Sequence, residues 1–245
     1  MRDVTVIIPV YNESLAIYEL LRRVTSVSLE PLTREIIIVD DGSTDDTIDK
    51  VRKFIDDNPQ HGPWITCHKA LINHGKGAAV RAGFTLATGD IIIIQDGDLE
   101  YLPEDYPTLL SPFKDPSVQV VYGSRFKNGN PKGMKLPNFV ANKILTWTTR
   151  LLYWQNITDE ATGYKAFRRS ILRSLSLKSR GFEFCPEFTG RVLQAGYTIH
   201  EVPIRYDPRG IFEGKKIRAR DGFIALWWLI KLRFARHLPA RTEAA

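Results

Sequence analysis

The sequence contains little cysteine and no long apolar run, and each shortage excludes a class of protein. The 245 residues include two cysteines, Cys67 and Cys185, and five scattered histidines, so neither a disulfide framework nor a zinc-ligand pattern can be drawn. The longest apolar stretch, residues 223–230, is far shorter than the roughly 20 residues that cross a bilayer. At the N-terminus a strand-like run begins almost immediately, at residues 4–8, and no signal-peptide pattern is present. We therefore expect a soluble, cytoplasmic protein.

The chain is moderately basic, and its charges are unevenly distributed. Lys and Arg number 34 against 28 Asp and Glu, which gives a net charge of +6 and a pI near 9.3. Such a chain could bind nucleic acid, anionic lipid or phosphorylated small molecules. We expect no nucleic-acid partner, because no reader motif is present and the basic cluster at residues 215–241 lies apart from the acidic residues at 40–57.

Runs of Val and Ile alternate with helical hydrophobic spacing along the chain. Strands are predicted at residues 4–8, 35–39, 64–67, 90–95, 118–122 and 198–204. Helices are predicted at residues 15–24, 44–54, 76–87, 138–154, 187–195 and 217–236. Leu15 is expected on the apolar face of the first helix, and Thr44 as the N-cap of the second. Continuous apolar strands between helices are typical of an α/β fold whose parallel sheet is covered on both faces.

No stretch of the sequence has the composition of a linker. With 43% hydrophobic residues the chain can bury a sizeable core, and its less regular second half is expected to pack on the first. Residues 126–137 mix Gly, Pro, Lys and Asn and are predicted to form a mobile surface loop. We predict a main domain of residues 1–216, followed by a C-terminal helix and tail of residues 217–245.

Two carboxylates follow the apolar run at residues 91–94. Asp96 and Asp98, separated by Gly97, place hard oxygen ligands where a buried strand ends, and such ligands suit Mg²⁺ or Mn²⁺. Alone, this pattern is equally typical of a turn. Three further strand ends carry polar residues, at 11–13, 40–41 and 125. Ligands of open α/β sheets bind beyond the carboxyl ends of the strands, so we expect these groups to form one site.

Two glycine-containing segments carry cations that suit phosphate groups. Residues 73–83 open a helix with Lys76 between two glycines; the spacing is not that of a Walker A loop, but exposed amides at a helix start favour anions. Arg209 and Lys215 lie on a second such segment. The planar guanidinium of the arginine and the compact ammonium of the lysine together suit a diphosphate. The alternative for the first segment is a glycine-flanked turn with a solvated Lys76, and the alternative for the second is an exposed basic turn.

Six motifs occur together in an order that matches a known family, although each is unspecific alone. They lie at residues 6–13 (Val-Ile-Ile-Pro-Val-Tyr-Asn-Glu), 39–45 (Val-Asp-Asp-Gly-Ser-Thr-Asp), 73–77 (Asn-His-Gly-Lys-Gly), 96–100 (Asp-Gly-Asp-Leu-Glu), 123–126 (Gly-Ser-Arg-Phe) and 162–165 (Thr-Gly-Tyr-Lys). Over roughly residues 3–222 the chain resembles family 2 glycosyltransferases of the GT-A fold. Within that family it is most similar to the dolichol-phosphate mannose and dolichol-phosphate glucose synthases.

The resemblance implies a Rossmann-like, mixed but mostly parallel sheet flanked by helices, with a nucleotide-sugar site and a bound Mg²⁺ or Mn²⁺. On these grounds the predicted nucleotide-sugar-binding residues are Pro9, Tyr11, Glu13, Val39, Asp40, Asp41, Lys76, Asp96, Gly97, Arg125, Arg209 and Lys215. The predicted metal ligands are Asp96, Asp98 and Glu100, and the predicted catalytic residues are Asp98, Arg125 and Asp159.

The implied reaction is the inverting transfer of a hexose from a UDP-glucose or GDP-mannose type of donor to a polyprenyl phosphate, dolichyl or undecaprenyl. A lipid phosphate is already anionic and needs positioning and charge balance rather than a base. If the acceptor is instead a saccharide or another hydroxyl, a carboxylate base is required, and Asp159 is the candidate. A sugar nucleotidyltransferase is a further alternative, disfavoured because no glycine-rich, arginine-containing N-terminal loop is present.

Aromatic residues and cations are mixed at residues 217–236, which we expect to form an amphipathic helix. Tryptophan beside Lys and Arg suits a membrane interface. Peripheral contact with the cytoplasmic face of a membrane would bring the enzyme to a lipid acceptor. The alternatives are a closing helix packed on the core and a contact within a homodimer.

Overall fold

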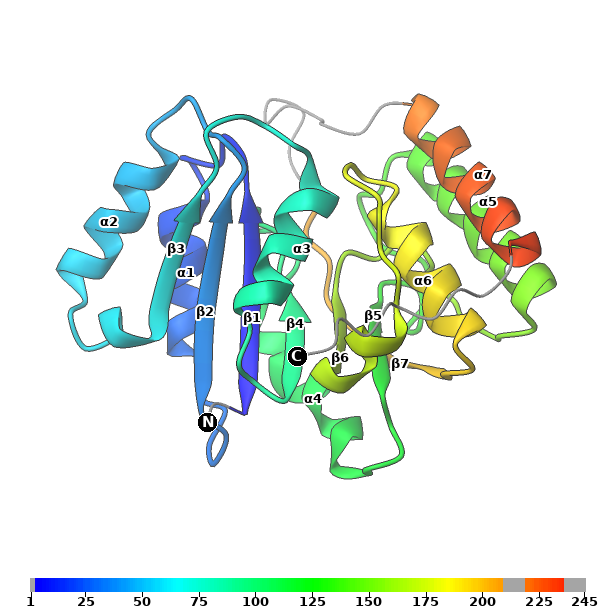
Figure 1. Cartoon of the computed structure of the whole chain (residues 1–245), viewed down its shortest axis with the longest axis horizontal. Helices are drawn as coiled ribbons and strands as arrows, with labels where there is room; N and C mark the ends of the chain where they lie inside the picture. Colours follow the sequence, from blue (N-terminus) through cyan, green and yellow to red (C-terminus); the bar gives the residue numbers. More distant parts are fainter. Residues whose placement is uncertain (1–2, 209–218, 236–245) are drawn as a thin grey trace.

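The centre of the molecule is a seven-stranded sheet (Figure 1). The computed structural model describes residues 3–208 and 219–235. The strands in chain order are β1 (Val4–Val10), β2 (Arg34–Asp40), β3 (Ile65–Lys69), β4 (Ile91–Ile94), β5 (Val120–Ser124), β6 (Lys165–Arg168) and β7 (Ile199–Pro203). Their order across the sheet is β3-β2-β1-β4-β6-β5-β7. All six predicted strands are therefore present, within a few residues of the expected bounds.

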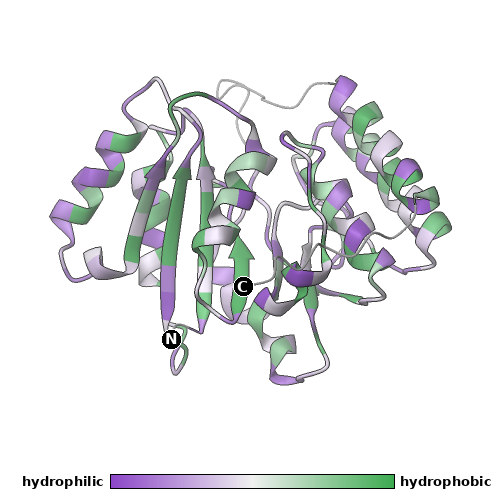
Figure 2. Cartoon of the chain, in the orientation of Figure 1, coloured by the Kyte–Doolittle hydropathy of each residue, from purple (hydrophilic) through white to green (hydrophobic). Residues whose placement is uncertain are grey.

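Helices cover both faces of this sheet (Figure 1). The helices are α1 (Ile17–Ser26), α2 (Thr47–Asp57), α3 (Lys76–Leu86), α4 (Tyr106–Leu110), α5 (Leu136–Tyr153), α6 (Phe184–Gln194) and α7 (Ala219–Phe234). Side chains alternate across β1, so Val6 belongs to the core cluster that includes α1, α2 and α4, whereas Ile7 belongs to the one that includes α3 and α6. β4 is buried on both faces and is an unbroken apolar run, green in Figure 2. β1 is buried along its whole length as well, and Thr5 is the polar residue within it.

Strand direction explains how the second half of the chain completes the sheet. β1 pairs in parallel with β2 and β4, and β2 with β3. β6 is antiparallel to both β4 and β5, and β5 is parallel to β7. The sheet is therefore mixed but mostly parallel, as predicted. We did not predict β6, because its four residues include Lys165 and Arg168, which interrupt the apolar pattern.

Two local predictions about the first helices were wrong. Leu15 is 92% exposed, because α1 begins at Ile17 and buries a face that starts there. Thr44 is not an N-cap: α2 begins at Thr47, after Asp46. The Thr44 amide instead donates to Oδ1 of Asn12, at 2.9 Å. Both residues thus belong to loops, and the contact joins the loop after β1 to the loop after β2.

The helix α7 packs on α5 and α6, along the right-hand side of Figure 1. Ala225, Leu229 and Leu232 are buried, and the Tyr153 hydroxyl donates to the Leu229 carbonyl at 2.8 Å. Trp227, on the other face, is 62% exposed. This helix therefore closes the core and also presents an aromatic surface. In residues 3–208 and 219–235, no helix is long and apolar enough to span a bilayer. The predicted domain boundary at residue 216 lies outside these ranges, so the two-part division stays a prediction.

Gly83 in α3 provides a test of how closely this helix packs on the sheet. A Cβ added there would lie 2.5 Å from Cγ2 of Ile7, a fully buried residue of β1. We expect Gly83→Ala to lower the free energy of unfolding by about 1–3 kcal/mol in urea denaturation, because overpacking outweighs the better helix propensity. Gly222→Ala in α7 is the matched control, since nothing lies within 4 Å of its added Cβ. That change should stabilise the protein by up to about 1 kcal/mol.

Candidate active site

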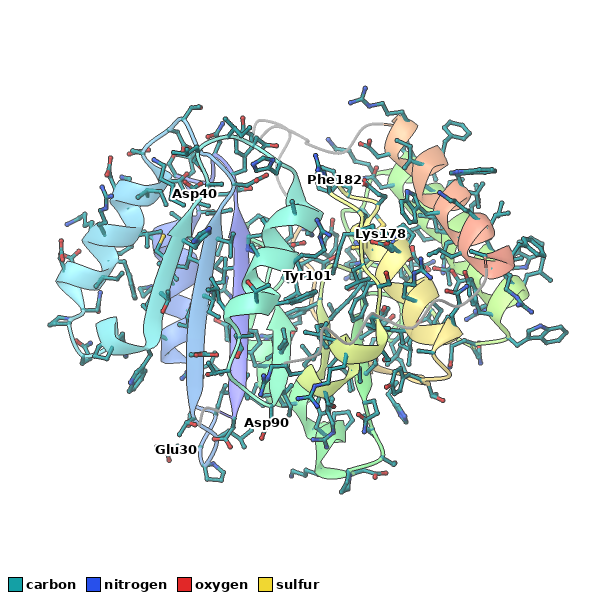
Figure 3. The ribbon with its side chains drawn as sticks, viewed as in Figure 1. Glu30, Asp40, Asp90, Tyr101, Lys178 and Phe182 are labelled. Carbon is teal, nitrogen blue, oxygen red and sulfur yellow. The ribbon has the colours of Figure 1, made fainter. Side chains whose placement is uncertain are left out.

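The polar strand ends lie at one edge of the sheet. β1, β2 and β4 are parallel, and β5 runs in the same direction because two antiparallel pairings through β6 separate it from β4. Residues after all four strands therefore meet at the carboxyl edge, as predicted. Figure 3 labels Asp40 at this edge and Glu30 and Asp90 at the opposite one. β6 runs the other way, so it begins at this edge and brings Gly163 there.

Asp40 and Asp41, the two aspartates after β2, have different surroundings. Asp40 is fully buried; its Oδ1 accepts from the Ser43 amide at 3.0 Å, and its Oδ2 accepts no hydrogen bond from any described residue. Asp41 accepts from the amides of His74 and Gly75, at 2.8 and 2.6 Å. A buried acceptor without a donor is unfavourable. Asp40 therefore retains capacity for a ligand's N–H or O–H group, whereas Asp41 holds the loop before α3.

The other residues predicted to bind the nucleoside lie around these aspartates. Pro9 pairs with Val39 in the sheet, and the Glu13 amide donates to the Thr47 hydroxyl at 2.8 Å. Tyr11 lies between them, at the first turn after β1. A groove of about 500 Å³ opens beside this edge; its lining includes Val39, Asp41 and His74. Hydrogen bonds thus join the loop after β1 to the residues after β2, and the latter reach the groove.

Asp96, Gly97 and Asp98 form a tight turn after β4. A Cβ on Gly97 would lie 2.9 Å from Cγ1 of Val10 and 3.0 Å from the Pro9 carbonyl, so only glycine fits. Oδ1 of Asp98 accepts from the Glu100 amide at 3.1 Å. Among the described residues, no three His, Cys, Asp or Glu side chains form a preassembled metal shell. Hard carboxylate oxygens still fit Mg²⁺ or Mn²⁺, because such ions are commonly held by one or two carboxylates together with substrate phosphates.

Lys76 forms an ion pair with Asp96, and both side chains are largely buried. Burial alone would lower the pKa of Lys76, but the Asp96 carboxylate outweighs it and raises that pKa above its usual value. The Gly77 and Ala78 amides donate to the Gly181 and Arg180 carbonyls, at 3.2 and 3.0 Å. The Gly77 and Ala78 amides are therefore already used by another loop, and the binding of an anion by this segment stays a prediction. The lysine is also not solvated.

Arg125 and Asp159 form a buried, two-pronged ion pair. Arg125 Nε and Nη2 donate to Oδ2 and Oδ1 of Asp159, each at 2.7 Å, and the Arg125 amide donates to Oδ2 at 3.0 Å. The guanidinium lies 5.8 Å from the ring centre of Tyr101 and 5.3 Å from that of Tyr206. Burial opposes the charge of Arg125, but Asp159 raises the pKa of this guanidinium well above its usual range. The site therefore contains a permanent, rigidly oriented cation.

Several residues that build the site were not predicted from the sequence. Tyr101 accepts from the Gly163 amide at 3.1 Å, and Glu201 of β7 accepts from the Thr158 and Asp159 amides, at 2.8 and 3.0 Å. With its amide turned to suit both neighbours, Asn142 of α5 bonds to the Arg125–Asp159 pair. None of these residues belongs to a recognisable motif. The predicted phosphate ligands Arg209 and Lys215 lie outside the described residues.

The sequence matches the family described as Glycosyl transferase family 2 over residues 5–176. The chain belongs to this family. Its fold agrees: glucosyl-3-phosphoglycerate synthase from Mycobacterium tuberculosis, in complex with Mn²⁺, UDP and phosphoglyceric acid, superposes with a TM-score of 0.72 at 20% identity. That alignment covers 96% of this chain and 80% of the other. The predicted GT-A architecture is confirmed.

Sequence relatives of this family 2 member are named for lipid phosphates. The undecaprenyl-phosphate mannosyltransferase of Micrococcus luteus is 31% identical over 88% of this chain and 87% of its own. The dolichol-phosphate mannosyltransferase of Pyrococcus furiosus is 30% identical over 86% of this chain and 58% of its own. The dodecaprenyl-phosphate galacturonate synthase of Rhizobium johnstonii is 26% identical over an alignment that covers 84% of this chain and 60% of that protein. The chain thus spans about three fifths of the length of the latter two relatives.

Proposed function

We propose that this protein transfers a hexose from a nucleotide-diphosphate sugar to a polyprenyl phosphate. One observation supports the choice of acceptor: a largely apolar groove begins at the residues next to Arg125 and Asp159 in the chain. Phe126 and Thr158, the chain neighbours of Arg125 and Asp159, line this groove of about 650 Å³ together with Phe139, Ile144 and Trp147. A saccharide would not require apolar walls, whereas an isoprenoid chain would. The names of the relatives support the same acceptor.

The polar edge suits the donor half of the reaction. Asp98, Glu100 and Asp96 would hold Mg²⁺ or Mn²⁺, which neutralises the negative charge that develops on the leaving diphosphate. Arg125 remains charged throughout, and its orientation is fixed by Asp159 and by the rings of Tyr101 and Tyr206. A fixed cation needs no reorganisation when charge develops, which is how such groups accelerate a reaction. Asp40 would accept a hydrogen bond from the nucleoside through its remaining oxygen.

The alternative acceptor is a hydroxyl group, with Asp159 as the base. Both oxygens of Asp159 bond to Arg125, and the side chain is fully buried. A general base must reach the proton it removes, and here both carboxylate oxygens are already occupied by the Arg125 guanidinium. This arrangement favours the lipid phosphate, which needs no base. Asp159 as a base stays a prediction, as do a homodimer and the cytoplasmic location.

Exposed aromatic residues on α5 and α7 suit peripheral contact with a membrane. Trp147 is 65% exposed and Trp227 62% exposed, on two helices that pack against each other. The same two helices carry cations: Lys143 of α5 has its Nζ 4.1 Å from the ring centre of Phe126, and Lys231 of α7 has its Nζ 5.2 Å from that of Trp228. Aromatic rings with neighbouring cations bind interfaces between anionic headgroups and acyl chains.

We expect Trp147→Ser and Trp227→Ser each to weaken binding to phosphatidylglycerol-containing vesicles by about tenfold, because each loses the burial of one large apolar side chain. Sedimentation with vesicles measures this binding. Trp64→Ser is the matched control, since Trp64 is also exposed but precedes β3, at the other end of the sheet. Equal losses for all three variants would contradict a membrane contact through α5 and α7.

The proposed activity is tested by nucleotide release from UDP- and GDP-sugars with Mg²⁺ or Mn²⁺, with and without a short polyprenyl phosphate. We expect release from one donor that depends on both the metal and the lipid phosphate. Nucleotide release that does not depend on the lipid phosphate would contradict the proposed acceptor and favour a hydroxyl group instead. Absence of release and of nucleotide binding under all conditions would overturn it.

A further inference from the structure

Lys76 occupies a place in the site that its predicted role as a phosphate ligand does not explain. Its Nζ is paired with Oδ1 of Asp96, a residue we predict to bind the metal. On the other side of that carboxylate, the Gly163 backbone approaches Oδ2 of Asp96 so closely that an added Cβ would collide with this oxygen. The cation beside Asp96 is thus the protein's own ammonium group.

The backbone around Lys76 is fixed on both sides. The His74 and Gly75 amides donate to Asp41, at 2.8 and 2.6 Å. The Gly77 amide donates to the Gly181 carbonyl at 3.2 Å, and Gly75, at a φ of +97°, approaches the Arg180 carbonyl too closely to carry a side chain. Only the four-carbon side chain of Lys76 can therefore move, and a lysine ammonium is a compact charge on a flexible stem.

We propose that Lys76 acts as an internal counter-ion that keeps the divalent metal out of the site until the nucleotide sugar arrives. A divalent cation at Asp96 and Asp98 must lie close to the ammonium or displace it, and like charges at short range repel strongly where water is scarce. The donor's diphosphate removes this conflict, because its negative charge attracts both cations. Lys76 then turns from Asp96 to the diphosphate, and metal and donor bind cooperatively.

The incomplete metal shell agrees with this role. Within the described part of the chain, no three carboxylate, imidazole or thiol groups stand ready for a metal. One carboxylate of the predicted set is already neutralised by Lys76. This inference rests on the proposed function, since it requires a donor with a diphosphate, but its core claim concerns the metal alone.

The test is Mn²⁺ binding to the full chain without nucleotide, measured by electron paramagnetic resonance of free Mn²⁺. We expect Lys76→Met to bind Mn²⁺ at least tenfold more tightly than the wild type. Adding UDP or GDP should tighten Mn²⁺ binding by at least tenfold in the wild type and by less than threefold in the variant. Lys76→Gln serves the same purpose if the methionine variant does not fold. Lys50→Met, which removes an exposed lysine paired with Asp46 at 3.7 Å, should change nothing.

Two outcomes would overturn the inference. One is that neither Lys76 variant binds Mn²⁺ more tightly than the wild type. The other is that the gain persists in the Lys76→Met/Asp96→Asn double variant, since the effect would then not pass through Asp96. A failure of the proposed function would be visible separately, because the wild type would then bind no nucleotide. The Mn²⁺ affinities of the wild type and the Lys76 variants, measured without nucleotide, would still test the role of Lys76.

Discussion

Asp98→Ala is expected to lower sugar transfer by about a thousandfold, which matches the upper range for removing one electrostatic contact to a developing anion. The Asp98 carboxylate lies at the tight turn after β4, where Oδ1 accepts from the Glu100 amide at 3.1 Å. Its loss removes both a predicted metal ligand and a contact that shapes the turn. The measurement is kcat/KM for the donor across a range of Mn²⁺ concentrations.

The metal dependence distinguishes this explanation from general damage. We expect the remaining activity of Asp98→Ala to require far more Mn²⁺ than the wild type, while the melting temperature changes little, because Asp98 lies at the rim of the core. Asp56→Ala, on the exposed face of α2, is the matched control and should keep full activity. An Asp98→Ala enzyme within threefold of the wild type would exclude this residue from the site.

Asp159→Ala is expected to lower the free energy of unfolding by about 3–5 kcal/mol, because it leaves the buried Arg125 guanidinium without its partner. Urea denaturation measures this loss. Asp46→Ala removes an exposed partner of Lys50 and should cost less than about 1 kcal/mol. The double variant Arg125→Met/Asp159→Leu should recover part of the stability, since an apolar pair of similar volume tolerates burial better than one unpaired charge.

Asp159→Asn separates the two roles considered for this carboxylate. If Asp159 only orients Arg125, the amide should lower kcat but keep the pH dependence of kcat/KM. If it is the base for a hydroxyl acceptor, the acidic limb of that profile should disappear. A loss of less than 1 kcal/mol in Asp159→Ala, together with a changed pH profile, would contradict our account of this pair.

The sheet and the edge that carries the site could be predicted because both depend on local patterns. Buried parallel strands such as β1 and β4 are apolar at nearly every position, with Thr5 of β1 as the exception, and parallel strands bring their carboxyl ends to one edge. Asp40, Asp96 and Arg125 could therefore be assigned to one site from their positions after such strands. The position of Gly163 could not, since β6 is short, antiparallel and interrupted by charge.

The contacts within the site could not be predicted, because they join segments far apart in the chain. Asn142, Glu201 and Tyr206 approach Arg125 and Asp159 only when α5, β7 and the following loop have packed. The pairing of Lys76 with Asp96 likewise depends on how the loop at residues 179–181 fixes the start of α3. Motifs thus predicted which residues gather at the edge, whereas tertiary packing decides which of them are already paired.

The most direct test of the account is transfer of a radiolabelled hexose from its nucleotide donor into a polyprenyl phosphate that partitions into butanol. The account predicts label in the organic phase with wild-type protein and Mn²⁺, loss of that label with EDTA or Asp98→Ala, and release of the sugar by mild acid, as expected for a glycosyl phosphate. Label that stays in water-soluble saccharide, with none in the lipid, would contradict the proposed acceptor.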